Sequence, residues 1–153
     1  MAALETHKHF MELALALARE AAAEGEVPVG AVIVRDGEVI GTGRNRREIC
    51  GNALAHAELE AIDEACRRVG GWQLVGCTLY VTLEPCPMCA GAIINSRIER
   101  VVQATLNPKA GSCGSVVNLF ELPYNHRPEV ITGVHEDVSS ALLKDFFRSL
   151  RKG

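Results

Sequence analysis

Apolar residues recur along the chain with two periods, that of a β-strand and that of an α-helix, and the period changes several times along the sequence. Residues 29–34 and 38–42 are rich in β-branched side chains and flank Asp36 and Gly37, a pair that accepts the positive backbone angles of a type I′ turn. Three later segments have the same β-prone composition, namely 78–83, 100–105 and 130–132. The pattern therefore predicts a hairpin followed by three further strands.

Helical spacing of apolar residues marks the segments around these strands. We expect a first amphipathic helix from a cap at Thr6 to Gly25, with one face formed by Phe10, Leu13, Leu17 and Ala21. A second helix is expected to begin near His56 and to stop at Gly70, with a buried stripe of Leu59, Ile62, Cys66 and Val69. Further helices are expected over 85–95, with Pro85 and Pro87 at its start, and over 116–120 and 138–150.

The alternation of helices and strands, with no internal repeat or linker, indicates an α/β fold. The chain has 153 residues, of which 48% are hydrophobic, and this is the usual size and composition of one compact core. We therefore expect a single domain that spans residues 1–153.

Export and membrane insertion are not indicated by the sequence. The first residues lack the basic, apolar and cleavage regions of a signal peptide, and no apolar run approaches the roughly 20 residues of a membrane helix. The six cysteines are scattered through a core-forming chain, which favours reduced thiols. We therefore expect a cytoplasmic protein.

The charge distribution limits the ways in which this chain can bind a polyanion. A net charge of -3 argues against non-specific coating of nucleic acid. Basic residues nevertheless gather in two places, where they either contact phosphates or remain solvated: Arg44, Arg46 and Arg47, and Lys144, Arg148, Arg151 and Lys152.

Two short motifs carry the candidate chemistry. His56 and Glu58 stand at the expected start of the second helix, and Cys86 and Cys89 follow about thirty residues later at the start of the next one. One imidazole and two thiolates leave the fourth position of a tetrahedral zinc ion open to water, and a carboxylate outside the ligand set can move protons. Helix N-termini favour thiolate over thiol. The combination is typical of zinc-dependent nucleobase deaminases, with Glu58 as the proton shuttle.

Two simpler interpretations compete with this one. A fourth protein donor, namely Cys50, Cys113 or His126, would close the zinc site and make it purely structural. Alternatively, Cys86 and Cys89 form a redox pair, although such a pair has no need of His56 and Glu58.

Several blocks of residues make this chain closely similar to the bacterial tRNA-specific adenosine deaminases, which have the cytidine-deaminase-like fold. The blocks lie at 26–31, 55–58, 79–92, 125–126 and 146–148, and the similarity extends over almost all of 10–151. It implies a three-layer α/β/α fold with a central mixed sheet of about five strands, and a homodimer. It further implies one Zn²⁺ per subunit and conversion of adenosine to inosine at the wobble position of a tRNA anticodon stem-loop.

The resemblance also implies a role for each candidate site residue. His56, Cys86 and Cys89 hold the zinc ion, and Glu58 moves protons. Asn45 hydrogen-bonds the flipped base, for which an amide is suited because it both donates and accepts; otherwise it only forms a turn. Backbone groups near Leu83 and Glu84 read the base edge, and the remaining substrate contacts are expected at Val27, Pro28, Val29, Asn107 and Phe147.

The departures from this family concentrate after the fourth strand. The chain has Gln103 in place of the usual aromatic residue, and Asn107 in place of an aspartate that accepts a hydrogen bond from a ribose 2′-OH. Residues 52–54 also differ from the usual loop. Two interpretations stay open, namely neutral drift in an RNA enzyme and a natural or engineered variant that deaminates adenine in single-stranded DNA. A deaminase of free nucleosides or bases and a catalytically idle zinc protein are the remaining alternatives.

Overall fold

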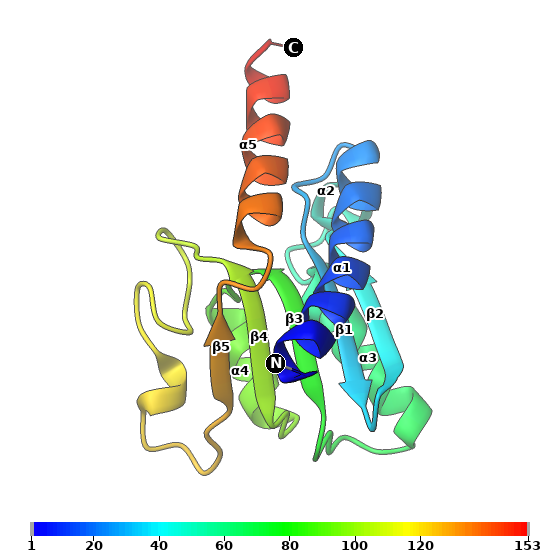
Figure 1. Cartoon of the computed structure of the whole chain (residues 1–153), viewed down its shortest axis with the longest axis vertical. Helices are drawn as coiled ribbons and strands as arrows, with labels where there is room; N and C mark the ends of the chain where they lie inside the picture. The colour runs from blue at the N-terminus through cyan, green and yellow to red at the C-terminus, as the bar shows by residue number, and fades with distance from the viewer. Residues whose placement is uncertain (1, 153) are drawn as a thin grey trace.

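The structure is a computed structural model that describes residues 2–152 and is built around one five-stranded mixed sheet (Figure 1). The order of the strands across the sheet is β2-β1-β3-β4-β5. β1 pairs antiparallel with β2 and β3, whereas β3, β4 and β5 run parallel to one another. The strands are β1 (Gly30–Arg35), β2 (Glu38–Arg44), β3 (Thr78–Leu83), β4 (Arg100–Thr105) and β5 (Glu129–Thr132).

Helices cover both faces of this sheet, which confirms the three-layer α/β/α arrangement (Figure 1). Two of them, α1 (Ala2–Ala23) and α5 (Glu136–Lys152), lie on the near face in this view, and α5 extends beyond the edge of the sheet. The far face carries α3 (Ala57–Val69) and α4 (Pro87–Asn95). Two short helices complete the elements, α2 (Arg47–Cys50) and the 3₁₀ helix η1 (Leu119–Glu121).

Alternating side chains of the strands belong to two separate hydrophobic cores, one on each face of the sheet. Val32, Tyr80 and Val102 pack against α1 on one face. Ile33, Leu79, Val81 and their neighbours pack against α3 and α4 on the other face. The inner strands are buried on both sides, as the nearly continuous apolar runs in their sequence require.

The expected hairpin and strands are present. Asp36 and Gly37 have φ angles of 52° and 76°, which are the positive values of a type I′ turn. The third and fourth strands have the expected bounds, and the fifth begins one residue earlier, at Glu129.

The expected start of the first helix was wrong. The helix begins at Ala2, so Thr6 lies inside it and is not its cap. The residues before Thr6 include Ala and Leu, which are strong helix formers and extend the helix towards the N-terminus. Its buried side chains are Phe10, Met11, Ala14, Leu15, Ala18 and Ala21, whereas Leu13 is 39% exposed.

The buried stripe of α3 also differs from the expected one. Its innermost apolar residues are Ala57, Ala61 and Ala65, each with no exposed surface, while the larger residues Leu59, Ile62, Cys66 and Val69 are only partly buried. The reason lies in β2, where Gly41 and Gly43 face this helix. A Cβ atom at either glycine would overlap a backbone carbonyl oxygen of α3, at Ala61 or Ala57 respectively. Small residues on both elements therefore bring the helix directly onto the strand.

Two short elements differ from the sequence prediction. The helix expected at 116–120 is a 3₁₀ turn at Leu119–Glu121, and α2 was not predicted. Neither has the length at which helical periodicity becomes visible in a sequence. Within residues 2–152, no helix combines the length and apolar character needed to cross a bilayer.

The contact between β2 and α3 yields a stability prediction. Replacing Gly41 by Ala should lower the free energy of unfolding by about 1–3 kcal/mol, the usual cost of overpacking a closed contact. Gly91→Ala is the matched control, because no atom lies within 4 Å of the added Cβ atom in α4. Alanine should raise helix stability there by up to about 1 kcal/mol. Urea unfolding of both variants measures the difference, and equal stabilities would contradict the close contact.

Candidate active site

The three predicted metal ligands lie together where two helices begin. His56 is the N-cap of α3, Cys86 is the N-cap of α4, and Cys89 lies in the first turn of α4. The Nδ1 atom of His56 is 3.7 Å from Cys86 Sγ and 3.5 Å from Cys89 Sγ. Tetrahedral zinc with bonds of about 2.0–2.1 Å to nitrogen and 2.3 Å to sulfur separates such ligands by about 3.6 Å. The donor set therefore fits a zinc ion in both chemistry and spacing.

None of the three candidate fourth donors joins this group. Among residues 2–152, the cluster of potential ligand atoms contains His56, Cys86 and Cys89 alone. Cys50 is exposed, and the His126 ring is hydrogen-bonded to the carbonyl oxygen of Ile98 at 2.7 Å. Cys113 is buried, but its sulfur is not in the group of ligand atoms that lie within 4.8 Å of one another. The site is thus the open, three-donor kind that catalytic zinc uses.

The two cysteines differ in how readily they ionise. A hydrogen bond with the Cys89 thiol, and a further one with His56, outweigh the effect of burial and lower the pKa of Cys86 to about 4. The same hydrogen bond and deep burial raise the pKa of Cys89. Cys86 is therefore a thiolate at neutral pH before any metal binds, and it offers an anionic donor at the helix start.

Glu58 lies beside the ligand set without being part of it. Its side chain is buried, with 4% of the residue exposed, and it comes from the first turn of α3. Burial raises the pKa of Glu58 to about 7, while backbone hydrogen bonding and the charge of His56 act in the opposite direction. A carboxyl group with a pKa near neutrality can both accept and release a proton, which is the requirement for a shuttle.

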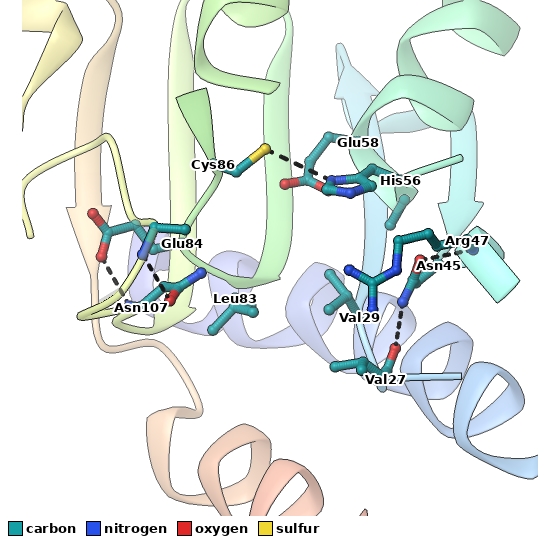
Figure 2. Close-up of a pocket in the computed structure, with 12 residues that line it drawn as sticks. Val27, Val29, Asn45, Arg47, His56, Glu58, Leu83, Glu84, Cys86 and Asn107 are labelled. Carbon is teal, nitrogen blue, oxygen red and sulfur yellow. Dashed lines mark hydrogen bonds between the residues drawn. The ribbon is translucent and has the colours of Figure 1, made fainter. Parts of the chain in front are cut away.

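A pocket of about 210 Å³ opens beside this centre, at the edge of the sheet where β2, β3 and β4 end and β1 begins. Figure 2 shows the His56, Glu58 and Cys86 group at one end of it, with Asn107 and Asn45 on opposite sides. The lining residues are Val27, Val29, Asn45, Arg47, His56, Ala57, Glu58, Leu83, Glu84, Cys86, Asn107 and Ala110.

Most of the residues expected to bind substrate line this pocket, but two do not. Pro28 is buried and is not among the lining residues. Phe147 is 44% exposed on α5 and is also absent from the lining. The backbone N–H of Glu84 donates to the carbonyl oxygen of Thr105 at 2.8 Å, so it is already used between strands.

Asn45 has two local hydrogen bonds. Its side-chain amide donates to the carbonyl oxygen of Val27 at 3.2 Å and accepts from the backbone N–H of Arg47 at 3.1 Å. The second bond is an Asx turn, so the turn-forming interpretation of this residue holds in the structure. One amide hydrogen remains to reach into the pocket.

Three lining residues were not identified from the sequence: Arg47, Ala57 and Ala110. Arg47 had been noticed only as part of a basic cluster. The structure neutralises much of that cluster, because Arg44 pairs with Glu24 at 2.8 Å and Arg46 pairs with Glu60 at 3.0 Å. Arg47 has only a longer contact of 3.7 Å with Glu48, which leaves its guanidinium group at the pocket rim.

Comparisons with known proteins agree with this site. Residues 4–105 match the family described as the cytidine and deoxycytidylate deaminase zinc-binding region. A tRNA-specific adenosine deaminase of Bacillus subtilis (strain 168) is 50% identical over 144 residues, covering 94% of this chain and 89% of that protein. A solved structure from a study of A-to-I editing by tRNA:A34 deaminases at the wobble position has a TM-score of 0.85 and 46% identity. That comparison covers 88% of this chain and 99% of the other.

A more distant structural relative has a different substrate. The guanine deaminase from Nitrosomonas europaea has a TM-score of 0.73 and 26% identity, over 91% of this chain and 83% of the other. Three matches at 46–50% identity instead have the name tRNA-specific adenosine deaminase and cover 94% of this chain. Two proteins named tRNA(Ile)-lysidine synthase, from Deinococcus deserti and Deinococcus radiodurans, are 47% and 46% identical over 91% of this chain, but the match covers only 26% and 24% of their own length. The chain belongs to the zinc-dependent cytidine and deoxycytidylate deaminase family and, within it, to the tRNA-specific adenosine deaminases.

Proposed function

We propose that this protein hydrolyses adenosine to inosine and ammonia in the anticodon loop of a tRNA, at the wobble position. The observation that carries the proposal is the buried Glu58 beside an open three-donor zinc site at the end of a small pocket. This arrangement provides a proton carrier next to the position where water must attack, which neither a structural zinc site nor a redox pair requires.

The proposed chemistry assigns one task to each group. His56, Cys86 and Cys89 would hold the zinc ion, which would lower the pKa of a bound water towards about 7 and so supply hydroxide near neutrality. Glu58 would take a proton from that water and deliver it to a nitrogen of the adenine ring as the oxygen bonds to C6. Glu58 would then carry the proton of the new C6 hydroxyl group to the exocyclic amine, so that the C6–N bond breaks, ammonia leaves and the carbonyl group of inosine remains.

One feature of the site supports a polynucleotide rather than a free base as substrate. The pocket, at about 210 Å³, has room for a base of either kind, so the discriminating contact lies at its rim. Arg47 lines the rim, where a guanidinium group can meet a phosphate next to the flipped nucleotide. The B. subtilis relative and the A34 deaminase structure support the choice of tRNA.

The first test removes the proton carrier. Glu58→Ala should lower kcat on an anticodon stem-loop by about 10²–10⁴-fold, the usual contribution of general acid–base catalysis. Zinc should stay bound, because Glu58 is not a ligand. Ammonia release and metal content per chain measure the two effects, and His56→Ala serves as the control that loses zinc as well.

Full activity of the Glu58 variant would contradict the proposed mechanism.

The salt dependence of binding separates the substrate classes, since phosphate contacts make binding to a hairpin fall steeply as salt rises. Turnover of free guanine or cytosine, indifferent to salt, would favour the free-base alternative. An idle zinc protein would release no ammonia at all.

Single-stranded DNA is a second candidate substrate, and the position of Asn107 favours it. The side-chain oxygen of Asn107 accepts from the backbone N–H of Ala110 at 3.3 Å. Its remaining polar group is an NH₂ donor, which can give a hydrogen bond to a ribose 2′-OH but cannot accept one. An aspartate would keep a second carboxylate oxygen free to accept that hydrogen bond.

Matched RNA and DNA hairpins test this second candidate. Asn107→Asp should raise the preference for RNA over DNA by about tenfold, the value of one hydrogen bond to a charged group. The ratio of kcat/KM on the two hairpins measures it in each protein. Activity confined to RNA in both proteins, with no gain from the aspartate, would leave drift as the explanation of Asn107.

We also propose that the protein is a cytoplasmic homodimer, as its resemblance to the family implies. Several large apolar side chains are more than half exposed, including Leu54 and Trp72 at 58% and Val116 at 60%. Covering such groups favours self-association. Light scattering should give twice the monomer mass of 16.5 kDa, and a monomer at micromolar concentration would contradict the dimer.

A further inference from the structure

A second buried carboxylate, Glu84, lies between β3 and α4 and belongs to neither the zinc ligands nor the proton pathway. It is 1% exposed. Its two oxygens accept hydrogen bonds from the backbone N–H groups of Asn107 at 3.0 Å, Cys113 at 3.1 Å and Ser115 at 2.9 Å, and from the Ser115 hydroxyl. All four donors come from one irregular segment, residues 107–115, which we call the rim loop.

The charge of Glu84 is stabilised by this loop. The hydrogen bonds from Asn107, Cys113 and Ser115 compensate for the burial of the carboxylate. Hydrogen bonds to an ionised acceptor are about twice as strong as neutral ones. The carboxylate and the loop therefore hold each other in place.

Gly111 gives independent evidence that the rim loop is wrapped around this carboxylate. A Cβ atom at Gly111 would overlap the carboxyl carbon of Glu84 and the backbone oxygen of Asn107. Glycine is thus required by close approach of the chain to the Glu84 side chain. The loop is also tied to the cysteine motif, since the backbone N–H of Ser112 donates to the carbonyl oxygen of Pro85 at 2.9 Å.

The rim loop forms one wall of the substrate pocket. It contributes Asn107 and Ala110 to the lining. Figure 2 shows the hydrogen bond between Glu84 and Asn107 on the side of the pocket opposite Asn45. Glu84 holds the backbone N–H of Asn107, and Asn107 itself lines the pocket. A change at Glu84 therefore alters the position of that wall.

We propose that Glu84 is a positioning residue for substrate binding, which fixes the rim loop and so sets the place of Asn107 and Ala110 against the bound nucleotide. This rests on the proposed function, because the loop is argued to meet an extruded nucleotide. Glu84 touches no reacting atom, so its loss acts on binding of the substrate and leaves the zinc ion and Glu58 in place.

Two variants test the role, with one exposed control. Glu84→Gln keeps the shape but turns an NH₂ group towards the backbone donors, and Ser115→Ala removes one donor at an exposed position. Glu121→Gln makes the same chemical change at an exposed glutamate outside the rim loop. Zinc content, KM and kcat on the anticodon hairpin, and amide hydrogen exchange at 107, 113 and 115 are measured for each protein.

We expect KM to rise about tenfold in Glu84→Gln and by a smaller factor in Ser115→Ala, with faster exchange of the three amides. The zinc content and kcat should stay close to those of the parent, and Glu121→Gln should match the parent throughout. Unchanged KM and amide exchange in the folded variants would overturn the proposal. A fall in kcat at constant KM would overturn it as well.

If Glu84→Gln does not fold, Ser115→Ala tests the proposal by itself, because the side chain that it changes is exposed.

Failure of this proposal is also distinguishable from failure of the proposed function. Absence of turnover by the parent protein on the hairpin would refute the function, whereas amide exchange of the rim loop still reports whether Glu84 anchors it.

Discussion

The direct contact of α3 with β2 is the constraint on which the active site depends. Gly41 and Gly43 present no side chain to the helix, and the helix presents alanines in return, so the backbones of the two elements meet. His56 and Glu58 stand at the start of that helix. Zinc ligands tolerate errors of only about 0.2 Å in bond length. An added methyl group at Gly43 would overlap the carbonyl oxygen of Ala57, the residue next to His56, so it would press on the start of the helix that holds this ligand.

Two buried glutamate side chains satisfy backbone N–H groups in the pocket walls, where no regular hydrogen bonding between strands is available. Irregular segments leave backbone N–H groups without partners, and these must be satisfied when buried. Glu84 accepts from the rim loop, and Glu26, 1% exposed, accepts from the N–H groups of Glu48 at 3.0 Å and Ile49 at 2.7 Å in α2. The two sides of the pocket are therefore held by anions whose burial is compensated by the donors they organise.

The parts of this molecule that could be predicted from sequence are those with a periodic or spaced signal. Five strands, the turn at Asp36 and the start of α4 follow from local propensity, and the metal ligands follow from motif spacing. The stripe of α3 differs from the predicted one because large apolar residues do not mark the closest contact, which is made by alanines facing glycines.

Other features depend on contacts between residues far apart in the chain. The anchoring by Glu84 joins positions 23 to 31 residues apart, and no local pattern distinguishes a buried glutamate from a solvated one. In the sequence, Arg47 stands out only by its positive charge, which it shares with Arg44 and Arg46. Pairing with glutamates of other elements separates these three, and such pairing is visible only in the fold.

The departures from the family pattern gather where they can alter substrate choice without disturbing the chemistry. Gln103 is buried in β4, where its side-chain amide donates to Thr132, and within residues 2–152 its carbonyl oxygen has no hydrogen-bond partner. Gln103 lies in β4, which leads into the rim loop, whereas the zinc ligands are positioned by α3 and α4. Because separate elements hold the substrate wall and the metal centre, changes from Gln103 to Asn107 can alter recognition while the catalytic set remains intact.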